Sequence, residues 1–479
     1  MTARIRLSLQ DELFLRAETR ETPVHVGGLQ IFRIPPRAPA HFVSTLAGRL
    51  RSHPVSVAPL NYRLAGGING KVMPSWEVDP DVDVDYHFRR SALPSPGGEK
   101  ELGMLVSRLH STPMDLTRPL WEYHLIEGLS GNRFATYTKL HHAMFDGAAG
   151  MRLINLSARR STSKVPPFWA DESRQIKETA AAPASTLGQV PAMIEDGVKS
   201  LPGLVRGLGT TALTALGLGS NPDLVSVTEA PRTIFNVHVG AQRRVATYSV
   251  SLERVKAIGE AAGGTINDVV LAACSGALRR YLAERDALPD HTLVAAVPMA
   301  LHHKEGAAAG NAVTSLLAHL GTDTDDVRQR FATICRSTTA GKAQLKDMTP
   351  TAAMHFVTLL SLPVLLEAVL PGFDKLAGPL ANLIISNVPG PRERLYFHGA
   401  EQLAHYPVSQ VSHGMALNIT VLSYAGGLFF GFVACADGVP SVQRLAVHMD
   451  AAMDELEAIF LRRPPHPERR TRPGARARR

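Results

Sequence analysis

Cysteine is scarce in this sequence, with only Cys274, Cys335 and Cys435 among 479 residues. The three are far apart and form no Cys-x-x-Cys pair. This excludes a disulfide-stapled scaffold, argues against a cysteine-rich zinc site and fits a reducing cytosol best. Charged residues interrupt the first 20 positions, so the unbroken apolar run of a signal peptide is also missing.

Aromatic residues make up only 6% of the chain and give no sign of base-stacking platforms for nucleic acid. The formal net charge is +8, but residues 462–479 hold eight arginines and one glutamate. The rest of the chain is therefore almost neutral and offers no basic surface to a phosphate backbone. We expect no nucleic-acid partner, and we expect a disordered Arg/Pro-rich tail over residues 462–479.

Long apolar runs are rare, and the best candidate is the stretch 348–366, which has no Asp, Glu, Lys or Arg. Pro363 would kink a membrane-spanning helix at this point. A buried helix is the favoured interpretation. A surface that dips into lipid and a true span remain open.

Hydrophobic residues make up 45% of the chain and charged residues 20%, enough for a sizeable core. Helix and strand patterns alternate along the sequence, which indicates an α/β or α+β fold. We expect an N-terminal lobe over residues 1–165, a helical crossover over 166–231 and a C-terminal lobe over 232–461.

Hydrophobic periodicity predicts the main elements of both lobes. In the first lobe, it predicts an opening helix and strand over 7–32, strands over 82–88 and 134–142, and helices over 99–110 and 148–159. In the second lobe, it predicts strands over 244–251, 293–299, 383–387, 417–423 and 428–435, and helices over 252–262, 265–281 and 441–461.

The most informative segment is His141-His142-Ala-Met-Phe-Asp146-Gly147. Side chains alternate along a strand, so the two histidines point in opposite directions and only one can enter a given cavity. An imidazole is well suited to take and return a proton near neutral pH. Asp146 stands where a loop becomes a helix, and Gly147 allows a close approach of backbone or ligand.

Two alternatives remain for this segment from its residues alone. The histidines could be a hydrogen-bonded pair at a strand end, with Asp146 only capping the next helix. A metal site is less well supported, because histidines that face opposite ways ligate poorly and no cysteine supports them.

The seven-residue pattern resembles the His-His-x-x-x-Asp-Gly signature of CoA-dependent acyltransferases related to chloramphenicol acetyltransferase and to condensation domains of peptide synthetases. Further motifs resemble the bacterial wax ester synthase/diacylglycerol acyltransferase branch, and the likeness covers about residues 7–460. These motifs are Pro119-Leu120-Trp121, Asn267-Asp268, Ser386-Asn387-Val-Pro-Gly-Pro391 and the opening Leu-Ser-x-x-Asp…His25-Val-Gly-Gly.

One segment departs from the family pattern. The family often continues Val-Ser-Met-Arg after the strand near residue 298, whereas this chain has Met299-Ala300-Leu301-His302-His303. The second histidine pair lacks the following Asp-Gly, so we expect a loop there.

The resemblance implies two chloramphenicol-acetyltransferase-like lobes around a central substrate tunnel. It implies an O-acyltransferase that moves a long-chain acyl group from acyl-CoA to diacylglycerol, a fatty alcohol or both. His142 would be the general base, His141 would support the turn, and Asp146 with Gly147 would shape the loop. No metal or redox cofactor is implied. A cytoplasmic protein at the surface of a membrane or lipid droplet is expected.

Several other motif residues have a second interpretation. Asn267 could donate to an oxyanion, with Asp268 beside it, or it could cap a helix. Thr420 or Ser423 could donate to the oxyanion, or they could form a polar pair at a sheet edge. Trp121, together with Pro119 and Leu120, is better suited to core packing than to substrate contact. Asn387 belongs to a turn, and Cys274 is expected in the core.

Two rival functions remain. One is a condensation-type enzyme that uses carrier-protein thioesters, which the Pro-Leu-Trp and Asn-Val-Pro-Gly motifs disfavour. The other is a catalytically idle lipid-binding or lipid-droplet protein on the same fold, which the intact His142…Asp146-Gly147 pattern disfavours.

Overall fold

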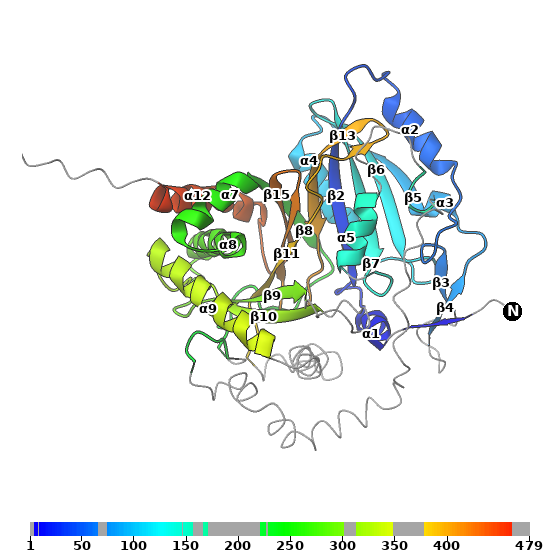
Figure 1. Cartoon of the computed structure of the whole chain (residues 1–479). Coiled ribbons are helices and arrows are strands. Elements are labelled where there is room, and N and C mark those ends of the chain that lie inside the picture. Colours follow the sequence, from blue (N-terminus) through cyan, green and yellow to red (C-terminus); the bar gives the residue numbers. More distant parts are fainter. Residues whose placement is uncertain are drawn as a thin grey trace, which may run out of the picture.

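The described part of the chain forms two sheet-rich lobes side by side (Figure 1). Several predicted features lie outside the described residues, as does most of the predicted crossover. These features are Asp146, His302, His303, the apolar stretch 348–366 and the tail 462–479. The computed structural model describes residues 4–7, 9–65, 74–145, 147–156, 166–170, 221–226, 229–300, 313–347 and 378–461.

The first lobe is built on a six-stranded sheet in the order β12-β13-β2-β7-β6-β5. The β5–β6 pair is parallel and the other neighbours are antiparallel. The register sets His25 of β2 opposite His141 of β7. The strands are β2 (His25–Arg33), β5 (Phe88–Ala92), β6 (Trp121–Leu129), β7 (Arg133–His141), β12 (Tyr396–Phe397) and β13 (Ala400–Val408).

Helices cover both faces of this sheet. Ile154 of α5 (Gly147–Leu156) packs against Gly28, whereas His110 of α4 (Glu99–Ser111) bonds to Tyr137, which points to the other face. Smaller elements complete the lobe: α1 (Leu9–Ala17), α2 (Phe42–Arg51), α3 (Val84–His87) and a three-stranded sheet of β1 (Ile5–Arg6), β4 (Ser75–Val78) and β3 (Tyr62–Ala65).

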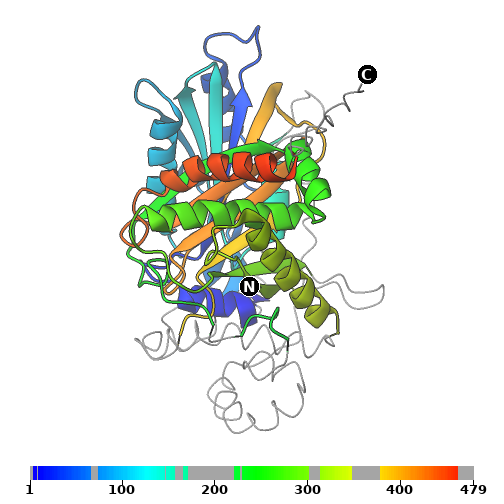
Figure 2. The same cartoon turned by 90° about the vertical axis from the view of Figure 1, so that its left-hand side faces the viewer.

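The second lobe has a six-stranded sheet in the order β10-β9-β11-β14-β15-β8. Its four described helices lie together on the side away from the first lobe (Figures 1 and 2). The elements are β8 (Arg243–Ser251), β9 (Val294–Ala300), β10 (Val313–His319), β11 (Leu383–Val388), β14 (Leu417–Tyr424), β15 (Gly427–Cys435), α7 (Leu252–Ala262), α8 (Ile266–Ala283), α9 (Val327–Asp347) and α12 (Gln443–Phe460).

None of the described helices is long and apolar enough to cross a membrane alone. The pair α7 and α8 passes such a test together, by length and composition only, with a bend of 97° between them. Burial raises the pKa of the Cys274 thiol on α8 to about 12, and this residue lies in the core as predicted.

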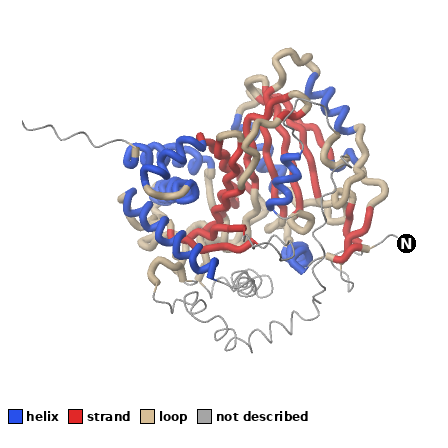
Figure 3. The backbone as a smooth tube through the Cα atoms, viewed as in Figure 1, coloured by secondary structure: helices blue, strands red, loops and turns tan. Residues whose placement is uncertain are grey.

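Part of the C-terminal half of the chain belongs to the first lobe, which corrects the predicted bounds of the second lobe. Residues 232–461 were expected to form the second lobe alone, but β12 and β13 join the edge of the first sheet beside β2 (Figure 3). The lobes therefore share a strand connection. Pairing of β13 with β2 satisfies backbone groups that would otherwise form an open sheet edge.

A second link joins α4 to the exposed edge of β8. The Ser107 hydroxyl accepts the backbone N–H of Val245 at 2.9 Å, and the Ser111 hydroxyl accepts that of Arg243 at 2.8 Å. The helix thus supplies acceptors to an edge strand that has no neighbouring strand on that side. This contact holds the first lobe against the second.

One predicted strand, 82–88, is wrong. The Asp83 carboxylate accepts the backbone N–H groups of Asp85 and Tyr86 and caps α3, so the strand begins only at Phe88. Strand β6, which starts at Trp121, was not predicted.

The lobes also pack against each other where β15 passes β13. A Cβ atom on Gly431 would lie 1.7 Å from the backbone oxygen of Pro407. Only a glycine leaves room for that carbonyl. The position therefore sets how closely the two sheets pack.

We expect Gly431→Ala to lower the free energy of unfolding by ~1–3 kcal/mol, because the added methyl group must push the two strands apart. Urea unfolding measures this change. Gly48→Ala is the matched control, since a Cβ at Gly48 in α2 meets nothing within 4 Å. That substitution should leave stability unchanged or raise it by up to ~1 kcal/mol. Equal effects of the two changes would contradict the close packing at Gly431.

Candidate active site at the end of the first sheet

The two histidines lie at the junction of β2 and β7, where β7 ends and a turn begins. The backbone N–H of His141 bonds to Leu120, and that of His142 bonds to Val24 at 3.0 Å. The N–H groups of Met144 and Phe145 both bond to the carbonyl of His141. Backbone contacts on both sides therefore hold the turn.

His141 is fully buried and supports this turn with its side chain. Its Nδ1 accepts the backbone N–H of Ala143 at 3.0 Å, and its Nε2 lies 2.6 Å from Glu18 Oε2. It shares the sheet face of Tyr137, as alternation predicts. The hydrogen-bonded alternative therefore describes His141.

His142 differs from His141 in burial and in surroundings. It lies in the turn, one residue beyond the end of the strand, and is only half-buried. Its ring centroid is 5.1 Å from that of Phe14 on α1. A half-buried imidazole can be reached by a substrate, as a general base requires. Gly147 is the first residue of α5.

The Pro-Leu-Trp motif contacts the start of the turn and packs in the core beside it. Trp121 is fully buried, donates its indole N–H to the Leu60 carbonyl at 2.8 Å, and stacks on His87 and Trp169. The neighbouring carbonyl of Leu120 accepts the N–H of His141. The expectation that Trp121 packs in the core is confirmed.

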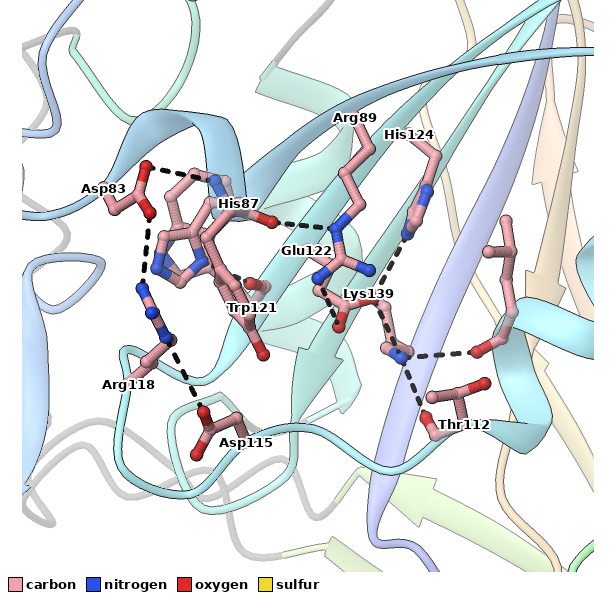
Figure 4. A network of polar contacts seen from close by, with 12 residues as sticks. Asp83, His87, Arg89, Thr112, Asp115, Arg118, Trp121, Glu122, His124 and Lys139 are labelled. Atoms are coloured by element: carbon pink, nitrogen blue, oxygen red, sulfur yellow. Dashed lines mark hydrogen bonds and ion pairs between the residues drawn. The ribbon is translucent and has the colours of Figure 1, made fainter.

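A buried ion pair lies on the same face of the sheet as His141. The Lys139 ammonium is 3.0 Å from Glu122 Oε2, and His124 Nε2 is 3.1 Å from the same oxygen. Figure 4 shows Glu122 between these two groups, with Arg89 on its other side. Side-chain exposure is 0% for Lys139 and 4% for Glu122.

The surroundings shift the pKa values of both partners of the pair. Burial alone would raise the pKa of Glu122, but the hydrogen bond from His124 and the charge of Lys139 outweigh it and lower the pKa to about 2. Burial also lowers the pKa of Lys139, and the charge of Glu122 opposes this shift. Lys139 further donates to the carbonyls of Leu109 and Thr112 at the end of α4.

His110 links this buried face to the second lobe. Its Nε2 lies 2.9 Å from the Ser409 carbonyl, so this nitrogen must carry the proton. Its Nδ1 then accepts the hydroxyl proton of Tyr137 at 2.8 Å. Burial lowers the pKa of His110 to about 3, which keeps the ring neutral. The Ser409 hydroxyl is in turn hydrogen-bonded to the Thr420 hydroxyl, with 2.7 Å between the two oxygens.

The two oxyanion candidates on β14 have different surroundings. The Thr420 hydroxyl is buried, contacts Ser409 and bonds to Asn418 Oδ1 at 2.8 Å, so it belongs to the link between the lobes. The Ser423 hydroxyl instead accepts the backbone N–H of Gly390 at 3.1 Å and holds the nearby turn. The two residues are three positions apart on β14, so strand alternation places their side chains on opposite faces.

The Asn267-Asp268 motif lies in the first turn of α8. The cap is Thr265, so the interpretation of Asn267 as the cap residue is wrong. The Asp268 carboxylate accepts from the N–H and hydroxyl of Thr265 and from the Thr338 hydroxyl. Asp268 thus joins α8 to α9. Asn387 lies within β11, and its turn begins only after Val388.

Sequence reasoning missed Glu18, His110, Lys139 and Glu122 as parts of this site. Glu122 follows the Pro-Leu-Trp motif, and Glu18 lies between the Asp and the His25 of the opening motif. Among the described residues, no group of three His, Cys, Asp or Glu side chains could hold a metal ion.

The sequence matches two family models in chain order. The wax ester synthase/diacylglycerol acyltransferase catalytic domain matches residues 7–270, and the C-terminal domain of the same family matches residues 309–457. The chain belongs to the wax ester synthase/diacylglycerol acyltransferase family. The resemblance expected from the motifs is therefore confirmed.

Relatives in this family are similar over nearly their whole length. A protein of Mycobacterium tuberculosis named as a probable diacylglycerol O-acyltransferase is 41% identical over 461 residues, covering 93% of this chain and 97% of that protein. An O-acyltransferase of Acinetobacter baylyi is 39% identical over 459 residues, covering 94% and 96%.

Solved structures agree with the fold. The wax ester synthase/diacylglycerol acyltransferase from Marinobacter aquaeolei has a TM-score of 0.77 and 34% identity, covering 95% of this chain and 99% of that one. The first condensation domain of the calcium-dependent antibiotic synthetase has a TM-score of 0.55 at 19% identity, covering 96% of each chain, and so shares the fold alone. The predicted fold class is confirmed.

Proposed function

We propose that this member of the family is an acyl-CoA-dependent O-acyltransferase. It transfers a long-chain acyl group to the hydroxyl of diacylglycerol, of a fatty alcohol or of both, and forms triacylglycerol or wax ester. The observation that carries this proposal is the held turn at residues 141–145, which leaves the half-buried His142 accessible in a chain of this family.

In the proposed reaction, His142 takes the proton of the acceptor hydroxyl. The oxygen attacks the thioester carbonyl, a new C–O bond forms, and the tetrahedral intermediate collapses with cleavage of the C–S bond. The proton on His142 passes to the leaving CoA thiolate. Acyl group and proton both move between the two substrates, so no cysteine or serine nucleophile, metal or redox cofactor is needed.

A two-acceptor assay tests this proposal. Purified full-length protein is incubated with radiolabelled palmitoyl-CoA and either hexadecanol or dioleoylglycerol. Labelled ester with at least one acceptor is the expected result. Product only from a carrier-protein thioester would favour a condensation-type enzyme, and no product from either donor would favour a lipid-binding protein.

Access to a lipid surface follows from the chemistry of these acceptors, which are nearly insoluble in water. We propose peripheral association with the cytoplasmic surface of a membrane or lipid droplet. The tail 462–479 supports this, because a polybasic segment contributes ~1 kcal/mol per Lys or Arg near anionic lipid, and salt screens that attraction.

Deletion of residues 462–479 should weaken co-sedimentation with anionic liposomes at low salt, because the deleted segment carries eight arginines. Activity on detergent-solubilised substrate should change little. If the truncated protein pellets as well as the full chain at every salt concentration, the tail has no membrane role.

A further inference from the structure

Two side chains from the N-terminal segment reach the two histidines of the candidate site. Phe14 on α1 packs against the ring of His142. Glu18, directly after α1, places Oε2 2.6 Å from His141 Nε2. The exposed fraction of the Glu18 side chain is 5% and that of His141 is 0%, so this contact is shielded from water. It joins residues that are 123 positions apart in the sequence.

The hydrogen bonds define which nitrogen of His141 carries the proton. The backbone N–H of Ala143 can only donate, so Nδ1 must be the acceptor in that bond. The proton of the neutral ring is then on Nε2 and is donated to Glu18. A ring with its proton on Nδ1 would lose the bond to Ala143, which is part of the turn that carries His142.

We propose that Glu18 is a positioning residue for acyl transfer. By accepting the Nε2 proton it keeps His141 in the tautomer that holds Ala143, and this fixes where the turn presents His142. The inference rests on the proposed role of His142 as the base. The carboxylate acts through His141 and touches neither substrate.

The surroundings of Glu18 favour a functional over a purely stabilising role. Its second oxygen, Oε1, is buried and has no hydrogen-bond partner within the described residues. A buried carboxylate with one oxygen unsatisfied costs stability. Lys139, on the same sheet face as His141, is near enough for Glu18 to favour its charged form. The N-terminal segment thus places a destabilising buried carboxylate, that of Glu18, where it orients the His141 ring.

Glu18→Ala and Glu18→Gln test the proposal, with Glu12→Ala as the matched control. Glu12 is also a buried carboxylate of this segment, but it pairs with Arg16 at 2.8 Å. We expect Glu18→Ala to lower kcat by ~10–100-fold, since a small displacement of a catalytic group costs that much. The KM for acyl-CoA and the KM for the acceptor should stay within about twofold of the wild-type values. Glu18→Gln, whose amide oxygen can still accept the proton, should keep most of kcat.

A second readout does not depend on turnover. In protein labelled with ¹⁵N-histidine, the His141 signal, assigned from its loss in His141→Gln, should report the Nε2–H tautomer. In Glu18→Ala it should report a mixture. The proposal is overturned if Glu18→Ala keeps the wild-type kcat per folded molecule, if Glu12→Ala loses as much kcat, or if the tautomer does not change. Absence of ester formation by the wild type would instead refute the proposed function, and the tautomer would still decide the role of Glu18.

Discussion

His142→Ala is expected to lower kcat by ~10²–10⁴-fold, the usual range for loss of a general base. The fold should remain intact, because the side chain is half-buried and the turn is held by backbone bonds and by His141. Steady-state kinetics with palmitoyl-CoA and the preferred acceptor measures the loss. Circular dichroism and the melting temperature show whether the variant is folded.

The neighbouring histidine supplies the comparison. His141→Ala should have a milder effect on kcat, because its ring bonds to Ala143 and Glu18 and is not the proposed base. It should cost more stability, since removal of a buried ring leaves a cavity. Equal losses of kcat in two well-folded variants would contradict the assignment of base and support.

Glu122→Gln is expected to lower the free energy of unfolding by ~3–5 kcal/mol. The change leaves the fully buried ammonium of Lys139 without its counter-charge, and an uncompensated buried charge is strongly destabilising. Urea unfolding followed by tryptophan fluorescence measures the effect, because Trp121 adjoins the pair in the sequence and is itself buried.

Glu127→Gln on the same strand is the control for this change. Its partner is Arg90, and their side chains are 29% and 43% exposed, so the loss should stay below ~1 kcal/mol. The double variant Glu122→Gln with Lys139→Met removes both charges and should recover part of the stability lost in Glu122→Gln. If Glu122→Gln costs no more than Glu127→Gln, the buried pair is not maintained as a charged unit.

The sequence predicted features that depend on local chemistry. Periodicity predicted helix α7 at its observed bounds. The strands expected over 417–423 and 428–435 are β14 and β15, which are joined by a turn with positive φ at Ala425 and Gly426. At residues 82–88 the alternating pattern was misleading, because the capping carboxylate of Asp83 favours a helical turn.

Features that depend on distant partners could not be predicted from the sequence. The pattern of β13 indicates a strand, but not that it pairs with β2 across more than 360 positions. The same holds for the bond of Glu18 to His141, since an isolated glutamate has no pattern of its own. The catalytic roles of His142 and Asp146 remain predictions.

Direct transfer through His142 is tested most directly by a single-turnover experiment. Enzyme in excess over radiolabelled palmitoyl-CoA is quenched with acid, first without an acceptor and then after hexadecanol or dioleoylglycerol is added. We predict that the label stays on CoA until the acceptor is present and then moves to ester, with one CoA thiol released per ester formed. His142→Ala should form this ester ~10²–10⁴-fold more slowly. Label bound covalently to the protein before the acceptor is added would contradict the account.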